Sequence, residues 1–427
     1  MPNIAVDKAN GNSVQFRISL YHDEREIRLN FPEQWDLVEC RMAGHDSAPL
    51  SADEIQWAFE NPIGSPRIRE MARGKEKVAI LFDDMDRPTP AYQLIPYVLK
   101  ELAQGGIGED KIRFVCAPGC HAPLTREEMT QKLGRDTVEN YSVFNHNVYE
   151  HLVKMGTTSQ GTPVIINREV ASCDLKIGIG CLIPHFSAGY GGGAKILLPG
   201  VSSLETVAAN HVNMKKLRPE RVGIGKIRDN PVRLDMEEAA RIAGLDCVVD
   251  VVLNHKKEIL GAFVGDLVEE HRKGVQLAAK IYGTEHPGKC DLVVLNTFPI
   301  ETAPKKVLSW AGADYLNDGG DVVLIWQSVI GMHPHFLNGA WGSDYGGKQW
   351  EKHGGPFRIP NAKRLLIYTE TMSKEEQKWW GHSDKIFRYR EWGALIEALK
   401  QDHGKGTRAA VYPYATLQCP LLPDEDL

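Results

Sequence analysis

The stretch from residue 178 to residue 211, GIGCLIPHFSAGYGGGAKILLPGVSSLETVAANH, carries several side chains that could do chemistry. Its glycine run consists of Gly191, Gly192 and Gly193. Because glycine has no Cβ, the backbone can bend sharply there, and successive N–H groups in such a loop favour an anion such as a phosphate. Lys195 could neutralise that anion or form a covalent bond, and His185 and His211 could move protons or ligate a metal. The stretch is therefore predicted to be a site, although glycine runs also occur as ordinary turns.

Polar residues also follow two other predicted strands. The three strands are residues 78–82, 112–116 and 175–180, the last of which leads into the glycine stretch. The first is followed by DDMDRPTP, with Asp84 and Arg87, and the second by APGCHAP, with His121. Ligands of open α/β sheets bind outside the carboxyl ends of the strands. These side chains are therefore predicted to converge with His185 and Lys195.

Cysteine spacing and amino-acid composition limit the classes of protein to which the chain can belong. Cys116, Cys120 and His121 form a C-x3-C-H triplet, but no second ligand pair at zinc spacing follows, so both cysteines are expected to pack in the interior. A net charge of −6 gives no support for a nucleic-acid partner, and no apolar run approaches the length of a membrane helix. The beginning of the chain has no apolar signal region, and eight scattered cysteines suggest reduced thiols in the cytoplasm.

The order of predicted elements indicates an α/β fold with two domains. A chain of 427 residues is too long for one ordinary core. Strands alternate with helices, which implies that each domain has a parallel or mixed sheet flanked by helices. The predicted domains are residues 1–283 and 290–427, joined by the polar segment GTEHPGK. Residues 14–31 alternate apolar and polar side chains around a polar break, which predicts a β-hairpin.

Four separated motifs together resemble the lactate racemase family, whose members carry a nickel-pincer cofactor. The motifs are DDMDRPTP, PGCHAP, PHFSAGYGGGAKILLPGV and ANH, and the resemblance covers most of residues 75–265, including IRDNPVRLDMEEAA. It implies a two-domain α/β fold with the active site in the interdomain cleft. It also implies a pyridinium-derived mononucleotide with sulfur groups, tethered through a thioamide to Lys195. Nickel would be held by that nucleotide and by His211, and the glycine loop would lie near the nucleotide phosphate.

The resemblance also implies roles for the other polar residues. His121 and His185 match two histidines that act as alternating base and acid, Arg87 matches the residue that binds the substrate carboxylate, and Asp84 is its acidic neighbour. One histidine would take the hydroxyl proton of a 2-hydroxyacid while hydride leaves C2 for the cofactor. Hydride would then return to the other face of the transient 2-keto acid. The family's cofactor-synthesis enzymes would be partners during maturation.

The sequence departs from the family pattern in the second domain, where a Tyr-Gln pair and a nearby lysine contact the substrate. The matching stretch is FPIETAPKKVLS, residues 298–309. Lys305 and Lys306 stand near the Tyr-Gln position, and Ser309 stands at the lysine position. This departure favours a substrate larger or more polar than lactate, such as a sugar acid or a dicarboxylate. Lys305 or Lys306 could supply positive charge or be solvated helix residues, and four tryptophans could line the pocket, Trp341, Trp350, Trp379 and Trp380.

Three other classes of protein fit the same residues. A pyridoxal-phosphate enzyme would use Lys195 beside a phosphate-binding glycine loop. A zinc-dependent hydrolase could use His121, His185 and His211 as metal ligands with one open position. A nucleotide-binding module without catalysis would need only the loop.

Overall fold

The chain forms two compact units, which differ from the predicted domains at the beginning of the chain. The computed structural model describes residues 4–5, 12–300, 304–327, 329, 335–337, 359–371, 373, 383–421, 423 and 426. The split unit comprises Met1–His45, Tyr282–Pro334 and Asn338–Leu421, and the inserted unit comprises Asp46–Ile281, His335–Leu337 and Leu422–Leu427. The sequence placed the first 45 residues with the domain that follows them, whereas they belong to the split unit. The reason is a strand pairing that joins the two ends of the chain.

The split unit is built on a seven-stranded sheet in the order β1-β4-β21-β17-β18-β19-β20. Its strands are β1 Ile4–Ala5, β4 Asp36–Cys40, β17 Cys290–Asn296, β18 Leu316–Ile325, β19 Ala362–Tyr368, β20 Ile386–Tyr389 and β21 Arg408–Tyr412. Every neighbouring pair is parallel except β1 and β4. Because β4 pairs with β21, the N-terminal segment cannot belong to the other unit.

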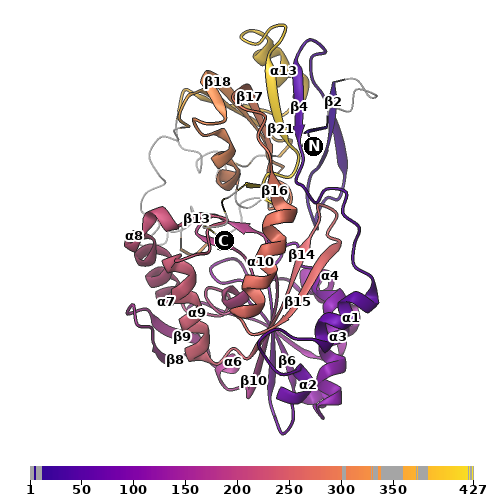
Figure 1. Ribbon diagram of the computed structural model, residues 1–427, viewed down its shortest axis with the longest axis vertical. Helices are drawn as coiled ribbons and strands as arrows, with labels where there is room; N and C mark the ends of the chain where they lie inside the picture. The colour runs from indigo at the N-terminus through magenta and orange to yellow at the C-terminus, as the bar shows by residue number, and fades with distance from the viewer. Residues whose placement is uncertain are drawn as a thin grey trace. The chain divides into compact units, whose positions relative to one another are not determined.

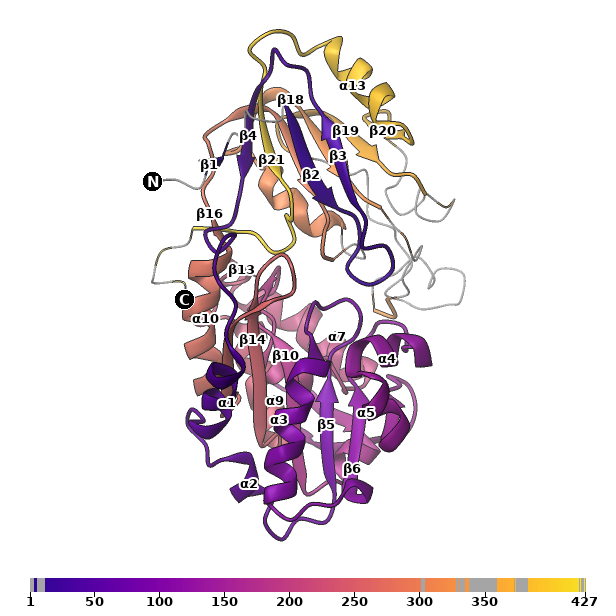
Figure 2. The ribbon, with the colours of Figure 1, turned by 90° about the vertical axis from the view of Figure 1, so that its right-hand side faces the viewer.

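Helical and hairpin layers cover the two faces of this sheet. The predicted hairpin is present as β2 Ser13–Arg17 and β3 Glu26–Asn30, which pair antiparallel. The hairpin shares one apolar cluster with helix α13, Trp392–Lys400, and the two lie side by side in Figure 2. The short helix η6, Pro304–Ala311, packs in a second cluster against the alternate side chains of the same strands. The sheet is therefore buried on both faces, as parallel sheets usually are.

The inserted unit has a six-stranded sheet in the order β15-β14-β10-β5-β6-β7. Its strands are β5 Val78–Phe82, β6 Ile112–Cys116, β7 Ser142–Asn145, β10 Leu175–Cys181, β14 Cys247–Leu253 and β15 Ile259–Gly265. Strands β15, β14, β10 and β6 of this sheet are labelled in Figure 1. All neighbours are parallel except β14 and β15, and every residue of β5, β10 and β14 is buried. The three strands that were predicted to carry the polar loops are β5, β6 and β10, and they are neighbours in this sheet.

Helices cover the sheet of the inserted unit. They are α1 Ala52–Glu60, α2 Ile68–Met71, α3 Ala91–Gln104, α4 Arg126–Leu133, α5 Arg135–Asn140, α9 Pro231–Ala243 and α10 Glu269–Tyr282. The side chain of Asn230 caps α9, Pro231 occupies its first turn, and Gly244 closes it with a left-handed backbone (φ 72°). Within the described part of the chain, no helix is long and apolar enough to cross a membrane. The predicted α/β class with parallel and mixed sheets is confirmed.

Candidate active site

The loops that follow β5 and β6 meet at one edge of the sheet and bring Asp84 and His121 into contact. The strands are parallel neighbours, with Phe82 opposite Cys116, so both loops begin at the same level. Oδ2 of Asp84 lies 2.6 Å from Nδ1 of His121. An ionised carboxylate only accepts hydrogen bonds, so the proton of this bond belongs to Nδ1. The nitrogen of His121 that can take up a proton is therefore Nε2.

The electrostatic surroundings of His121 favour its charged form. Burial opposes the imidazolium, but the negative charge and hydrogen bond of Asp84 outweigh it, and the pKa of His121 is raised. Asp86 adds to this effect, with Oδ2 3.9 Å from the same nitrogen. His121 is thus a base strengthened by its neighbour, an arrangement common among catalytic histidines.

Lys132, which the sequence analysis did not select, fixes the loop that carries Asp84. Its ammonium donates to the carbonyl oxygens of Asp84 at 2.9 Å and Arg87 at 2.8 Å, and it forms an ion pair with Asp83 at 2.6 Å. The side chain comes from α4 and is 1% exposed. Nothing in the sequence distinguishes this lysine from the other helix lysines, apart from its position on the same face as Met129.

Arg87 lies in the same loop as Asp84. Its Nη1 donates to the carbonyl oxygen of Asp86 at 2.9 Å and to the Asp86 carboxylate at 3.3 Å. The carboxylates of Asp86 and Asp84 outweigh burial and raise the pKa of Arg87, so its positive charge is secure. A planar guanidinium beside the basic histidine is suited to bind a substrate carboxylate.

The ring proton of His185 lies on the other nitrogen from that of His121. His185 ends β11, Pro184–His185, which turns back on β12, Ala188–Tyr190. The backbone N–H groups of Ala188 and Ser187 point at Nδ1 of His185, at 3.1 and 3.3 Å. Nδ1 therefore accepts, and the proton of the neutral ring lies on Nε2. In this conformation His121 offers a basic nitrogen, whereas His185 offers a donor.

His211 lies on a short π-helix, which the sequence did not predict. Helix α7, Leu204–Ala208, continues into the π-helix η4, Ala209–Met214, and then into α8, Lys215–Leu217. Asn210 anchors the turn through bonds to the carbonyl oxygen of Val232 at 3.1 Å and to Asp235 at 2.8 Å. Single π-turns occur often at functional sites, because the extra residue changes which side chains face inward.

The environment of His211 and Lys195 fits a metal-bearing cofactor. Within the described part of the chain, no group hydrogen-bonds the buried Nδ1 of His211. Burial, followed by the charges of Lys195, Lys215, His335 and His121, lowers the pKa of His211 well below its usual value. The ring is therefore neutral, as a metal ligand must be. Lys195 is itself only 8% exposed, on the 3-10 turn Gly193–Ile196, named η3.

The glycine loop is tied to the protein more closely than a phosphate cradle would be. The amide of Gly191 donates to the carbonyl oxygen of Ile183 at 2.7 Å, and that of Gly193 donates to Oδ2 of Asp250 at 2.5 Å. Gly192 has φ 68°, and a Cβ there would lie 2.5 Å from the same carboxylate. Two of the three N–H donors that the phosphate hypothesis needs are therefore used, and the glycines provide a tight bend.

A fourth imidazole, that of His335, lies against His121. His335 forms an isolated antiparallel bridge with His121, and the two rings meet edge to face with centroids 5.1 Å apart. Phe336 donates its N–H to the carbonyl oxygen of Cys120 at 2.7 Å, and Leu337 is buried in the apolar core of the inserted unit. No sequence signal relates this tripeptide to a loop more than 200 residues earlier in the chain.

Comparison with known proteins identifies the family. A family model described as the lactate racemase N-terminal domain matches residues 21–223. The lactate racemase of Lactiplantibacillus plantarum is 32% identical over 322 residues, which cover 72% of this chain and 74% of that protein. The chain belongs to the lactate racemase family. The lactate racemase of Thermoanaerobacterium thermosaccharolyticum is 30% identical over 322 residues, which cover 74% of this chain and 75% of that protein.

Solved structures support the same fold. The lactate racemase apoprotein from Thermoanaerobacterium thermosaccharolyticum superposes with a TM-score of 0.74 at 22% identity, covering 95% of this chain and 99% of that one. A protein from Thermotoga maritima superposes with a TM-score of 0.59 at 17% identity, covering 83% and 98% of the two chains. As a member of the lactate racemase family, the chain is an isomerase that acts as a racemase.

The residues that depart from the lactate racemase pattern lie in the split unit. The ammonium of Lys306 donates to the carbonyl oxygen of Thr416 at 3.1 Å, and Ser309 is exposed on η6. The side chain of Lys305 and the four tryptophans, Trp341, Trp350, Trp379 and Trp380, lie outside the described residues. The charge of Lys306 is therefore partly engaged within its own unit.

The alternative zinc site is not formed among the described residues. There, no three histidine, cysteine or acidic side chains are grouped so that they could hold a metal ion by themselves. Cys116 and Cys120 are buried, and burial raises the pKa of Cys116 well above its usual value and that of Cys120 to about 12. Both cysteines are inert packing residues, as the sequence predicted.

Proposed function

We propose that this member of the lactate racemase family inverts C2 of a 2-hydroxyacid, using His121 and His185 as acid and base. The observation that carries the proposal is the Asp84–His121 pair, with 2.6 Å between Oδ2 and Nδ1, at the carboxyl ends of adjacent parallel strands. The charges of Lys195 and His121 both lower the pKa of His211, which supports a role for the three groups in one site. Family membership supplies the reaction class.

The proposal includes a nickel-pincer nucleotide held by two side chains. Lys195 would carry the nucleotide covalently, and His211 would ligate the nickel through a neutral ring nitrogen. When bound, this cofactor supplies a reversible acceptor for the hydride of C2. Imidazole together with sulfur ligands suits a late transition metal such as nickel. The buried Nδ1 of His211, without a hydrogen-bond partner among the described residues, supports this role.

The protein side chains bind and orient the substrate and move its hydroxyl proton. Arg87 binds the carboxylate, which fixes the direction of C2. His121 takes the hydroxyl proton on Nε2, and Asp84 stabilises the resulting imidazolium. His185 carries its proton on Nε2 in the conformation described here, so that proton must move to Nδ1, away from the N–H groups of Ser187 and Ala188, before Nε2 can act as the base for the opposite enantiomer. The resting arrangement is therefore set for proton uptake by His121.

We propose further that the substrate is larger or more polar than lactate, as in a sugar acid or a dicarboxylate. The support is the sequence at residues 298–309, where Lys305 and Lys306 stand near the Tyr-Gln position of the family pattern and Ser309 stands at its lysine position. No nucleic acid or membrane takes part in this proposal. All eight cysteines are free thiols, which fits a reducing cytoplasm, and cofactor-synthesis enzymes would load the protein there.

Production together with the cofactor-synthesis enzymes tests the proposal. We expect stoichiometric nickel, a mass adduct on the Lys195 peptide, and loss of optical activity from one or more 2-hydroxyacids in a chiral-chromatography screen. An adduct that borohydride reduces, without metal, would instead support pyridoxal phosphate. A His185→Ala variant that carries the adduct and nickel yet racemises at the full rate would contradict the acid/base assignment.

A further inference from the structure

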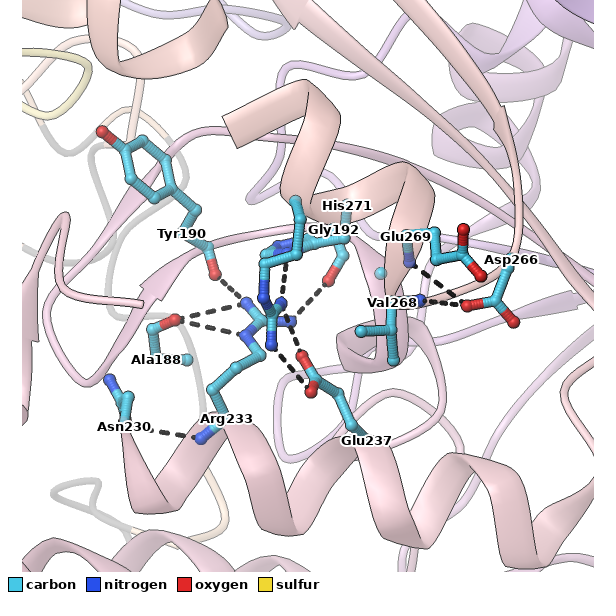
Figure 3. Close-up of polar contacts among 12 residues, drawn as sticks. Ala188, Tyr190, Gly192, Asn230, Arg233, Glu237, Asp266, Val268, Glu269 and His271 are labelled. Atoms are coloured by element: carbon cyan, nitrogen blue, oxygen red, sulfur yellow. Dashed lines mark hydrogen bonds and ion pairs between the residues drawn. The ribbon is translucent and has the colours of Figure 1, made fainter. Parts of the chain in front are cut away.

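One buried guanidinium lies behind the loop that joins His185 to Lys195. Arg233, in the first turn of α9, is 0% exposed and is directed at the backbone of residues 188–192 (Figure 3). Nε and Nη2 both lie 3.3 Å from the carbonyl oxygen of Ala188, and Nη1 lies 3.1 Å from that of Gly192. Nη2 also donates to Tyr190 and, at 3.4 Å, to Gly191. One side chain thus hydrogen-bonds the carbonyl groups of four residues in a tight loop.

The two outer carbonyl groups belong to peptides that hold functional side chains. The backbone N–H of Ala188 donates to Nδ1 of His185 at 3.1 Å, while the carbonyl oxygen of the same residue accepts from Arg233. The carbonyl oxygen of Gly192 accepts both Nη1 of Arg233 and the backbone N–H of Lys195, at 3.1 and 3.2 Å. Arg233 is therefore linked through Ala188 to the ring of His185, and through Gly192 to the backbone of Lys195.

Other groups from the same region reinforce this loop. Asn230, also on α9, donates to the carbonyl oxygen of Ser187 at 2.8 Å. His271, on α10, hydrogen-bonds the carbonyl oxygen of Gly191 through Nε2 at 2.9 Å. Arg272 in turn hydrogen-bonds His271 at 3.1 Å and pairs with Glu237 at 2.8 Å. The loop is thus held from both helices, and Arg233 makes the most contacts.

The charge of Arg233 is preserved despite burial. Burial lowers its pKa to about 10, with Glu237 acting in the opposite direction, so the guanidinium stays protonated at neutral pH. Five N–H donors in a fixed plane suit several carbonyl groups at once, which a lysine ammonium on a flexible stem cannot match. This specific geometry argues for more than filling of the interior.

We infer that Arg233 is a positioning residue that fixes His185 and Lys195 relative to each other through the backbone of residues 188–192. The inference rests on the proposed function of those two side chains. It predicts that substitution of Arg233 impairs both cofactor attachment to Lys195 and proton transfer by His185, although Arg233 contacts neither the cofactor nor the substrate.

The test compares Arg233→Lys with Arg241→Met, a control on the same helix. Arg241 pairs only with Asp266 in the contacts described, at 2.5 Å, and has a half-exposed side chain. Each variant is produced with the cofactor-synthesis enzymes, and adduct occupancy on Lys195 is read by peptide mass spectrometry. In apo protein, labelling of Lys195 by an amine-reactive reagent is timed against exposed Lys216.

We expect Arg233→Lys to fold, to carry less adduct, and to show an altered labelling rate of Lys195. For the loaded fraction, kcat should fall about 100-fold with little change in KM, the scale expected for a displacement of about 1 Å at a reacting group. Arg241→Met should match the wild type in all these measurements. If Arg233→Lys does not fold, Asn230→Ser replaces it, because serine keeps the helix cap but loses the bond to Ser187.

The outcomes separate this inference from the proposed function. Wild-type protein without an adduct on Lys195 would overturn the proposed function. Wild-type protein with the adduct, beside an Arg233→Lys variant with the same occupancy, labelling rate and kcat, would overturn the positioning role alone. A variant that loses thermal stability but keeps kcat per loaded chain would also overturn it, because Arg233 would then be structural only.

Discussion

Replacement of Asp84 by asparagine tests the acid/base assignment with little change of volume. Oδ2 of Asp84 lies 2.6 Å from Nδ1 of His121, and Oδ1 accepts the N–H of Asp86 at 3.0 Å. An asparagine that keeps its oxygen on the Asp86 amide must turn its NH2 group toward His121. Nδ1 then becomes an acceptor and the ring proton moves to Nε2, which blocks the nitrogen that should take the substrate proton.

Two effects determine how far kcat falls in the Asp84→Asn enzyme. The hydrogen bond to a charged group is worth about 1.5–3 kcal/mol. At about 1.4 kcal/mol for each factor of ten, its loss lowers the rate by about 10- to 150-fold. The reversed tautomer adds to this, and the same change beside the histidine of a serine protease triad lowers kcat about 10⁴-fold. We therefore expect kcat of Asp84→Asn to fall by about 10²- to 10⁴-fold.

The pH dependence gives a second, independent measure. His121 must be neutral to accept a proton, so kcat/KM of the wild type should fall as pH drops through a pKa above the usual value of about 6.5. Without the carboxylate this acidic limb should move to lower pH, because Asp84 raises the pKa of His121. The raised pKa also stabilises the folded protein below about pH 6.5, and that contribution is lost as pH rises through the folded-state pKa.

Both effects are measured as racemisation rates of enzyme with equal nickel and adduct content. Asp86→Asn serves as a graded comparison, since its Oδ2 lies 3.9 Å from the same nitrogen and should matter less. An Asp84→Asn enzyme with wild-type kcat and an unmoved acidic limb would refute the assignment of His121 as the base.

Substitutions at three further positions address other parts of the site. Lys132→Met leaves Asp83 buried without its ion pair, and should lower the free energy of unfolding by about 3–5 kcal/mol in urea titrations; a change below 1 kcal/mol would contradict the ion-pair role. His335→Phe keeps an edge-to-face ring against His121, whereas His335→Ala loses about 0.5–1.5 kcal/mol, so only the alanine enzyme should show a lower kcat. Gly192→Ala meets φ 68° and the nearby carboxylate, and should cost about 2–5 kcal/mol of unfolding free energy by the same titration; an unchanged midpoint would show that the loop adapts.

The sequence predicts those parts of the site that depend on local order along the chain. Buried strands at 78–82 and 112–116 are each followed by polar residues, and parallel pairing then places Asp84 beside His121. The two ends of α9 also follow from local signals, because proline suits the first turn of a helix, as at Pro231, and glycine suits the left-handed residue after its end, as at Gly244.

The supporting residues could not be predicted, because their roles depend on tertiary contacts. Lys132 and Arg233 lie on ordinary amphipathic helices, and only the packing of those helices turns their charges toward loop carbonyl groups. His335 comes from a segment whose docking on Cys120 has no local signal. The π-turn around His211 likewise has no composition that marks it in advance.

The pairing of β4 with β21 has a consequence for how the protein is made. On the ribosome, residues 36–40 emerge long before residues 408–412, which supply the strand beside them. The inserted unit can begin folding as a nearly continuous segment, 46–281, while β4 waits. A waiting strand is an exposed edge that other chains can join. Overproduction should therefore benefit from chaperones that cover this strand until residues 408–412 are made.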